Sequence, residues 1–452
     1  MSISEKLVDY CISLQYASLP AEVVDKTKYL FLDYLGLAAR GSAFDSSKPV
    51  ISLVKKLGAG GSSRVAGTDL QVKPEYACLA NGCFSHSLEL DDVINEASLH
   101  PAVAVFPAAV AACEMEGKGG KNFIEAAVAG YEVMARLGRA INPSEHYRRG
   151  FHPTGTCGTF AAAATAAKIF GLEKEAFRSA LGIAGSQAAA SMEFLEDGAW
   201  TKRFHPGWAA HSGLLAALLA REGFQGTKKP LEGKYGFFNS YSDKPQPELA
   251  TENLGQDYYL LRTSTKPHAC CRYNQSPIDA ILSLVKNRDL QPEQVKKVSV
   301  ALVKTAMPIV AEPAETKRRP QTVVDAQFSM PFAAAVAITK QRAFLDEYSL
   351  EVIQSEEIKK LMEKVECYND PELDKEFPRK WPCHVTIETV QGEKLEAKVE
   401  YPKGDPENPL TWDELIYKFE NVTRPVWDTK QQQELIDQVK SLENLETVQP
   451  KY

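Results

Sequence analysis

Residues 89–101 place carboxylates and a histidine at a spacing suited to proton transfer. Glu89, Asp91 and Asp92 follow an apolar helical run, and His100 stands just before the next helix, which is rich in Ala and Val. Carboxylates past the end of one helix, near a histidine at the positive N-terminus of the next, can hold and move protons beside an anion. We therefore expect acid–base chemistry at this segment.

Two later segments also place a histidine in front of a helix, and in both of them basic residues lead into a helix of small residues. Residues 149–156 contain His152 before a proline, and residues 201–211 contain Lys202 and His205. In both we expect a basic loop, with the helix of small residues following it. Several loops that each carry site chemistry are what an enzyme pocket needs.

A further basic segment opens what we expect to be a second domain. It brings Lys266, His268, Arg272 and Tyr273 within eight residues. Small-molecule clefts often lie where two domains meet. Cations there would neutralise an anionic substrate as charge develops in the transition state.

These patterns assign an expected role to each residue. The residues expected to act in catalysis are His100, His152, Lys202, Asp91 and Asp92. The residues expected to bind the substrate are Glu89, Lys266, His268, Arg272, Tyr273 and His205. The residues expected only to cap helices or to pack are His86, His146, His384 and Asp325. The expected chemistry is proton abstraction beside a carboxylate or carbonyl.

A metal site is the sharpest alternative reading of the same residues. His86, Asp91, Asp92 and His100 could ligate a metal, as in metal-dependent hydrolases. The spacing is a weak match for a metal site, and lysines from the partner segments would repel a cation, so we expect no metal. The sequence also has no G-x-G-x-x-G after a strand, no Walker loop and no G-x-S-x-G elbow, so we expect no cofactor either.

Composition sets the broad class of the protein. The chain has 452 residues with 44% hydrophobic and 25% charged residues, as in soluble globular proteins of two or three domains. A net charge of −7 argues against a nucleic-acid binder. Nine scattered cysteines, including the Cys270–Cys271 pair, suggest buried reduced thiols. With no apolar signal core and no long apolar run, we expect a cytoplasmic protein, or a matrix-like location if a targeting peptide has been removed.

The apolar periodicity changes along the chain. Helices are expected at residues 4–41, 74–90, 100–116, 122–141, 155–170, 174–190, 207–222, 322–338, 410–419 and 430–442. Strands are expected at residues 64–66, as an isolated piece, and at 298–303, 365–368, 383–390 and 395–401. The expected fold is α+β, with a large helical domain of residues 1–262 completed by 402–452 and a smaller α/β domain of residues 263–401.

The basic segments together resemble the MmgE/PrpD family. The sequence reads RGFHPTGTCGTF from residue 149, TKRFHPGWAAHSG from residue 201 and KPHACCRY from residue 266, after the Leu-Asp-Asp…His-Pro stretch. The resemblance covers nearly the whole chain. It implies a large helical domain, a smaller α/β lid domain, a homodimer and catalysis without metal or organic cofactor. The family's active-site positions fall on His100, His152, Lys202 and Lys266.

The sequence departs from the family's named members at several positions. Glu89 stands at a position where the decarboxylases share an Asp, and Val93 stands where they have a Thr. Cys271 and Phe332 fall where the decarboxylases have a histidine and a tyrosine. Methylcitrate dehydratases have Asn-Asp-Thr-Trp where this chain has Asp-Asp-Val-Ile from Asp91.

The expected activity is that of a cofactor-independent lyase. We expect a dehydratase-type elimination on a small di- or tricarboxylic acid, begun by removal of a proton next to a carboxylate. The alternatives are an epimerase or isomerase of an amino- or imino-dicarboxylate, a cis-aconitate-type decarboxylase and, more remotely, a metal-dependent hydrolase. A non-catalytic carboxylate-binding protein built on the same fold is a further alternative. The expected partners are the substrate and a second copy of the chain, with no nucleic acid and no membrane.

Overall fold

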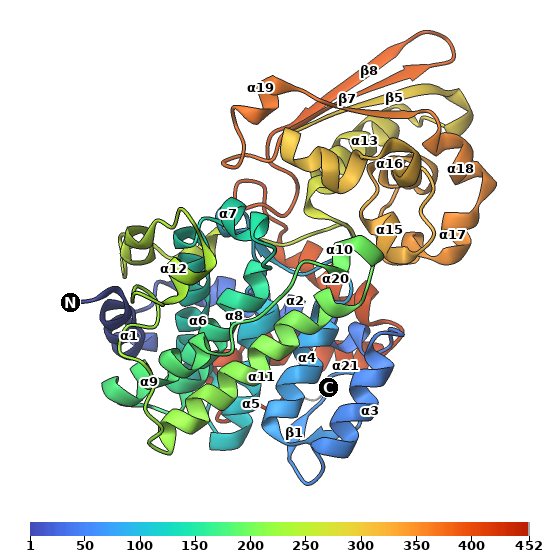
Figure 1. The fold of residues 1–452 in the computed structure, drawn as a ribbon. Coiled ribbons are helices and arrows are strands. Elements are labelled where there is room, and N and C mark those ends of the chain that lie inside the picture. Colours follow the sequence, from blue (N-terminus) through green and yellow to red (C-terminus); the bar gives the residue numbers. More distant parts are fainter. Residues whose placement is uncertain (451–452) are drawn as a thin grey trace. The chain divides into compact units, whose positions relative to one another are not determined.

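The computed structural model describes residues 1–450 and divides them into two compact units. The helical unit contains residues 1–87 and 91–263 and the chain from Thr411 onward. The α/β unit contains residues 264–410 together with the short segment Leu88–Leu90. The expected α+β class, with one large helical part and one smaller mixed part, is confirmed (Figure 1).

The helical unit is built mainly from α-helices. The longer helices are α1 (Ile3–Ser13), α2 (Ala21–Gly41), α3 (Ser47–Leu57), α4 (Pro74–Ser85), α5 (Ala102–Glu116), α6 (Gly120–Ala140), α8 (Pro153–Ile169), α9 (Lys174–Gly185), α11 (Thr201–Arg221), α20 (Trp412–Thr423) and α21 (Thr429–Lys440). The short helices are α7 (Pro143–Arg148), α10 (Phe194–Asp197) and α12 (Phe237–Tyr241). The short strands are β1 (Ser63–Arg64), β2 (Gln71–Val72) and β3 (Val93–Ile94), and β4 (Thr263–Ser264) lies where the chain leaves this unit.

The centre of the helical unit is formed by α8, which packs against α11, α6 and α5. Every residue of α8 except Lys168 is buried, and most are Ala, Gly or Thr. Small side chains let neighbouring helices approach closely, so α8 contacts helices on several sides. Gly213 on α11 illustrates this, because a Cβ there would lie 2.5 Å from the Cβ of Ala162 on α8.

A buried ion pair ties the C-terminal helices to the N-terminal part of the helical unit. Lys418 on α20 contacts Asp33 on α2 at 2.7 Å, and both side chains are buried. One turn further along α2, a Cβ at Gly36 would lie 2.9 Å from the ring of Phe419. The chain thus returns to the helical unit after the α/β unit.

The α/β unit holds one mixed sheet with helices on one face (Figure 1). The strands are β5 (Val295–Leu302), β6 (Val365–Asn369), β7 (Cys383–Thr389) and β8 (Lys394–Val399), in the order β6-β5-β7-β8. Strand β5 runs parallel to β6 and antiparallel to β7. The helices are α13 (Gln275–Arg288), α14 (Ala314–Lys317), α15 (Val323–Gln327), α16 (Met330–Lys340), α17 (Leu350–Gln354), α18 (Glu356–Met362) and α19 (Pro371–Asp374). Alternate residues of β7 are buried, as expected of a sheet covered on one face.

Several expected boundaries were wrong, each for a local reason. The helix expected at 322–338 is split, because the Ser329 side chain caps α16 by accepting from Phe332 N–H. Helix α4 ends at Ser85 rather than at 90. The piece expected as an isolated strand at 64–66 is β1, which pairs with β2. Within α15, the expected role of Asp325 is confirmed, since it forms a capping box with Thr322.

The expected loop before α11 is also wrong. Helix α11 already begins at Thr201, so Lys202 and His205 lie in its first two turns. Pro206 lies inside the helix, where it lacks the N–H that would bond to the carbonyl of Lys202. Residues three apart share a helix face, so the lysine and the histidine lie on the same side of α11.

Candidate active site

Helices α4 and α11 cross at a pair of glycines. A Cβ at Gly82 would lie 2.7 Å from the Cα of Gly207, and a Cβ at Gly207 would lie 2.3 Å from the carbonyl oxygen of Leu79. Only glycine fits where two backbones approach this closely. The crossing brings His86, at the C-terminal end of α4, into the same buried region as His205, near the start of α11.

The carboxylate of Asp91 contacts two histidines. Its Oδ2 lies 2.7 Å from Nδ1 of His86 and 3.2 Å from Nδ1 of His100. Asp91 and His86 are fully buried, whereas the His100 side chain is 13% exposed. The rings of the two histidines lie 5.2 Å apart. One carboxylate oxygen therefore holds two imidazoles together, and only His100 has contact with the surface.

The neighbours of His100 fix which of its nitrogens carries the proton. Nδ1 lies 2.5 Å from the backbone carbonyl of Asp92 and 3.2 Å from the Asp91 carboxylate. A carbonyl can only accept a hydrogen bond, so Nδ1 must be the donor. In the neutral ring, Nε2 is then the basic nitrogen. His100 therefore has the tautomer that a general base acting through Nε2 requires.

Asp92 has a different role from Asp91. Its carboxyl accepts from the backbone N–H of Ala102, in the first turn of α5, and from the hydroxyl of Tyr131 on α6. Burial, together with the nearby charges of Asp91 and Asp33, raises the pKa of Asp92 to about 8. Asp92 thus anchors the start of α5 and fixes the carbonyl to which His100 donates.

His152 and His205 form the other half of the cluster. Their Nδ1 atoms lie 3.1 Å apart, so one ring donates a proton to the other. The backbone N–H of His152 donates to Ala190 and places this residue at the N-terminus of α8. The His86 ring lies 5.8 Å from the His152 ring, and Phe194 contacts both members of the pair edge-on. Four histidines from separate segments therefore lie together in the helical unit.

Burial keeps this histidine pair neutral at physiological pH. It lowers the pKa of His152 well below its usual 6.5, and the positive charges that His205, His86, Lys202 and His100 can carry lower it further. The pKa of His205 falls to about 4, mainly through burial and then through His86 and Lys202. Lys202 is thus close enough to act on both histidines. A neutral imidazole can accept a proton from a substrate.

Within the α/β unit, Lys266 and Glu89 are brought together. The Lys266 ammonium lies 3.3 Å from the Glu89 carbonyl and 3.9 Å from its carboxylate, and both side chains are buried. Glu89 has a φ of 56°, which places it in the left-handed region. Non-glycine residues adopt this conformation mostly where the surrounding structure imposes it, often at functional sites.

The other residues expected to bind substrate already have partners inside the α/β unit. His268 Nε2 lies 2.9 Å from the Asp279 carboxylate. Arg272 contacts Asp405 at 2.5 Å and stacks on Trp381, which also contacts Tyr273. These contacts hold residues 266–273 in a fixed shape around Lys266.

Three residues of the histidine cluster, His86, Tyr131 and Phe194, were not predicted from the sequence as active-site residues. His86 does cap the end of α4, as expected, but it also contacts Asp91, and its ring lies beside the rings of His100 and His152. Its position five residues before Asp91 was the available signal. Nothing in the local pattern distinguishes Tyr131 or Phe194 from ordinary core aromatics.

The remaining histidines and the cysteine pair behave as expected. His146 is fully buried and bonds to Tyr241 and Thr156, which is a packing role. His384 lies on strand β7 with Glu396 as its neighbour, at 3.7 Å. Cys270 and Cys271 are buried free thiols, and burial raises the pKa of Cys270 to about 12. A thiol of this kind is a poor nucleophile.

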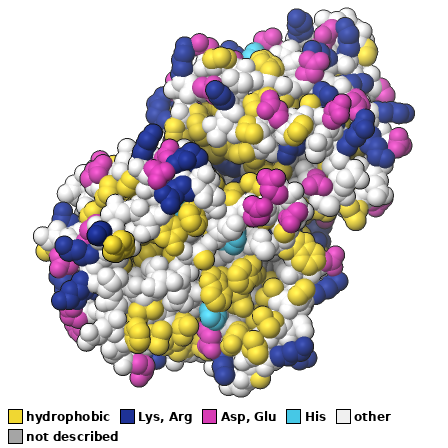
Figure 2. Space-filling view, viewed as in Figure 1, with side chains coloured by type: hydrophobic (Ala, Val, Ile, Leu, Met, Phe, Trp, Pro, Cys, Tyr) yellow, Lys and Arg dark blue, Asp and Glu magenta, His cyan; other side chains and the backbone are white. Residues whose placement is uncertain are grey.

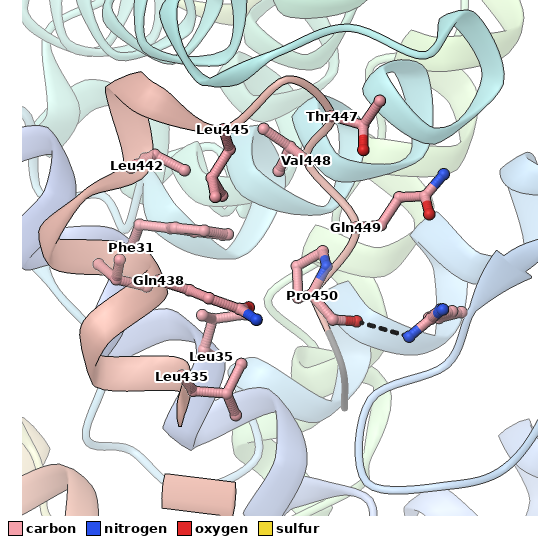
Figure 3. Close-up of a pocket in the computed structure, with 12 residues that line it drawn as sticks. Phe31, Leu35, Leu435, Gln438, Leu442, Leu445, Thr447, Val448, Gln449 and Pro450 are labelled. Atoms are coloured by element: carbon pink, nitrogen blue, oxygen red, sulfur yellow. Dashed lines mark hydrogen bonds between the residues drawn. The ribbon is translucent and has the colours of Figure 1, made fainter. Parts of the chain in front are cut away.

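Two other features of residues 1–450 bear on ligand binding. No group of three or more His, Cys, Asp or Glu side chains in this range is arranged to hold a metal ion. A cavity of about 220 Å³ in the helical unit is lined by residues of α2, α21 and the C-terminal segment, both apolar and polar, the latter including Gln438, Thr447 and Gln449 (Figure 3), and also by Arg64. There Arg64 donates to the carbonyl of Pro450 at 3.3 Å, and none of the predicted site residues lines this cavity.

Comparison with known proteins agrees with the resemblance found in the sequence. The MmgE/PrpD N-terminal domain matches residues 5–250, and the MmgE/PrpD C-terminal domain matches residues 268–444. The chain is 30% identical to a cis-aconitate decarboxylase-like protein of Aspergillus oryzae, over 98% of this chain and 95% of that one. It is 28% identical to the cis-aconitate decarboxylase of Aspergillus terreus, over 99% and 94%. It is 23% identical to the 2-methylcitrate dehydratase of Salmonella typhimurium, over 95% and 92%. The chain therefore belongs to the MmgE/PrpD family, as a lyase of that family.

Proposed function

We propose that the protein catalyses an elimination on a small tricarboxylic acid, with His100 as the base that removes a proton next to a carboxylate. The observation that carries this proposal is the orientation of His100. Its Nδ1 faces two acceptors, the Asp91 carboxylate and the Asp92 carbonyl, so Nε2 is the basic nitrogen. An oriented imidazole of this kind contributes about 10² to 10⁴ to a rate.

The leaving hydroxyl needs a proton to depart as water. When His100 removes the proton next to the carboxylate it becomes an imidazolium, a carbon–carbon double bond forms and the carbon–oxygen bond of a neighbouring hydroxyl breaks. The hydroxyl leaves as water with the proton that the His100 imidazolium returns, and His100 ends neutral. The neutral His152–His205 pair, whose Nδ1 atoms lie 3.1 Å apart, accepts and donates hydrogen bonds to the substrate. The Lys202 ammonium beside the pair stabilises negative charge that develops on a substrate carboxylate.

Decarboxylation is the second candidate, and the comparisons favour it. The decarboxylase-named relatives are 25–30% identical to this chain, against 21–23% for those named dehydratases. In that reaction carbon dioxide leaves and the resulting carbanion takes a proton from an imidazolium. A protonated His100 provides that proton and ends neutral, so the two candidates differ in substrate rather than in machinery.

The test is proton NMR of the protein in D₂O with citrate-like, aconitate-like, aspartate-like and hydroxy-dicarboxylate acids. A new alkene proton signal, with loss of the methylene proton signals of the hydroxy acid, supports elimination. Loss of a carboxylate with deuterium at the neighbouring carbon supports decarboxylation. Deuterium uptake alone supports the isomerase alternative, and no change with any acid contradicts the proposal.

Variants of the two lysines separate catalysis from binding. Lys202→Ala or His152→Ala should reduce kcat by about 10² to 10⁴ while Tm stays close to wild type. Lys174→Ala is the control for Lys202, since Lys174 also lies in the first turn of a helix in the same unit. We propose that Lys266 binds a substrate carboxylate, so Lys266→Met should raise KM about tenfold to a hundredfold. Lys297→Met, which removes a surface ion pair with Glu366, should leave KM unchanged.

We further propose a homodimer in the cytoplasm. Leu195, Trp200 and Phe204 are 57%, 51% and 42% exposed near the start of α11, and Phe204 stacks on Trp208. Figure 2 shows hydrophobic side chains gathered over this part of the helical unit. A second copy is the occupant that the family resemblance implies. Phe204→Asp should therefore shift the mass measured by light scattering from dimer to monomer.

The cytoplasmic location rests on the cysteines, all nine of which are free thiols. Free thiols are typical of reducing compartments. Among residues 1–450, no helix is long and apolar enough to cross a membrane. Fractionation of cells that express the tagged protein tests the location, and recovery in a membrane or secreted fraction would contradict it.

A further inference from the structure

We infer that His86 is a positioning residue of this active site, which holds the Asp91 carboxylate in the orientation that fixes His100. This inference rests on the proposed function, since it assigns a role in orienting the proposed base. It concerns a residue expected from the sequence to have a capping or packing role or, in the metal alternative, that of a ligand. Because its side chain is fully buried, His86 acts through Asp91 and does not contact the substrate.

The contacts of His86 point to this role. Its Nδ1 lies 2.7 Å from Oδ2 of Asp91, and that same oxygen lies 3.2 Å from Nδ1 of His100. The His86 contact is the shorter of the two, so it has the stronger influence on where the carboxylate points. Without it, Asp91 could rotate away from His100, and His100 would lose one of the two acceptors that select its tautomer.

The other nitrogen of His86 gives a second, independent observation. Nε2 is buried and has no hydrogen-bond partner among residues 1–450. A buried polar atom without a partner destabilises a folded protein by roughly 1–3 kcal/mol, so a residue that served only packing would be better apolar. The single bond that His86 makes is to Asp91, which indicates that this bond is the reason for a histidine here.

The surroundings of His86 keep it in place. Its ring lies nearly parallel to that of His152, with an angle of 25° and 5.8 Å between centroids. The tight crossing of Gly82 and Gly207 fixes the end of α4 from which it projects. The side chain therefore has little freedom to move, as a positioning residue requires.

Two substitutions at the same position test the inference. His86→Asn keeps a donor close to where Nδ1 lies and should leave kcat within about threefold of wild type. His86→Leu removes the donor and should lower kcat about tenfold to a hundredfold with little change in KM, as part of the 10² to 10⁴ that an oriented base contributes. His146→Leu is the matched control, because it removes another fully buried histidine from the same unit. It should lower Tm as His86→Leu does, but leave the pH profile of kcat unchanged.

A readout without substrate keeps this inference separate from the proposed function. With histidines labelled with ¹⁵N, NMR reports the tautomer of His100 directly, which we expect to carry its proton on Nδ1 in wild type and His86→Asn. In His86→Leu that preference should weaken. If His86→Leu does not fold, His86→Gln replaces it, since its amide lies one carbon further from the backbone.

Each outcome bears on one of the two proposals. If the wild type shows no turnover, the proposed function is contradicted. If the His100 tautomer is nevertheless altered in His86→Leu, the positioning role of His86 still holds. An unchanged tautomer and an unchanged kcat in His86→Leu overturn the positioning role. Equal losses of kcat in His86→Asn and His86→Leu also overturn the positioning role. They would show that kcat depends on the shape of the imidazole ring and not on the N–H donor that faces Asp91.

Discussion

Gly82 and Gly207 lie so close together that a Cβ on Gly82 would be 2.7 Å from the Cα of Gly207. The two glycines belong to α4 and α11, and their contact sets the distance between the ends of these helices that carry His86 and His205. The histidine cluster therefore depends on a contact between two residues that have no side chain.

Gly207→Ala tests this dependence. The new Cβ would lie 2.3 Å from the carbonyl of Leu79 and 2.5 Å from the Cys83 sulfur, so α4 and α11 must move apart. Overpacking of this kind destabilises a protein by about 1–3 kcal/mol. We expect a lower Tm together with a loss of kcat. Gly185→Ala on α9, where the nearest atom is a Phe160 ring carbon at 3.3 Å, is the control and should retain both. Wild-type activity in Gly207→Ala would show that the crossing does not set the cluster.

His152 should keep a neutral imidazole well below pH 6.5. Burial, followed by the charges of the neighbouring histidines and Lys202, lowers the pKa of His152 well below its usual 6.5. The imidazole therefore remains neutral at pH values where an exposed histidine is already charged. The measurement is a ¹⁵N NMR titration of the labelled histidines between pH 4 and 9, with His152→Ala to assign the His152 signal. A His152 signal that titrates at or above pH 6.5 would contradict the lowered pKa.

Asp92 should make the folded state less stable as the pH rises. In the folded chain its pKa is about 8, against an ordinary value of 3.8. Between these two pH values the folded chain keeps a proton that the unfolded chain releases. The contribution of Asp92 to the free energy of unfolding is therefore greatest below pH 3.8 and is lost as the pH rises through about 8.

Asp92→Asn should remove this pH dependence, since an amide can still accept from Ala102 N–H without a titrating proton. Urea unfolding at pH 5 and pH 8 measures it, and the variant should gain stability relative to wild type as the pH rises. Asp69→Asn, at an exposed position, controls for the loss of one negative charge. A difference between variant and wild type that does not change with pH would contradict the raised pKa.

The Lys418–Asp33 pair should show the behaviour of a buried ion pair. Lys418→Met leaves the Asp33 carboxylate buried without the partner that it contacts at 2.7 Å. Breaking such a pair typically destabilises a protein by about 3–5 kcal/mol, whereas replacing both partners with apolar residues is often close to neutral. Urea unfolding of Lys418→Met, Asp33→Leu and the double variant forms a double-mutant cycle. If the double variant loses the sum of the two single losses, the pair does not act as a unit.

The sequence by itself determined most of the elements and predicted most of the residues that we propose carry chemistry. Periodicity located the helices and the strands of the sheet, because the burial of one face is written in the spacing of apolar residues. The His-Pro pairs before α5 and α8 placed His100 and His152 at helix starts, since proline favours the first helical turn. The motifs around them identified the family.

Only the tertiary structure decided how these residues are joined. His86 and His205 are more than a hundred residues apart in the chain, so no local pattern shows that they share one buried cluster. The division of roles between Asp91, which binds histidines, and Asp92, which anchors α5, depends on where each side chain points after folding. The pKa of Asp92 and of His152 is set by burial and by neighbouring charges. Both are properties of the packed helices and not of the residue types.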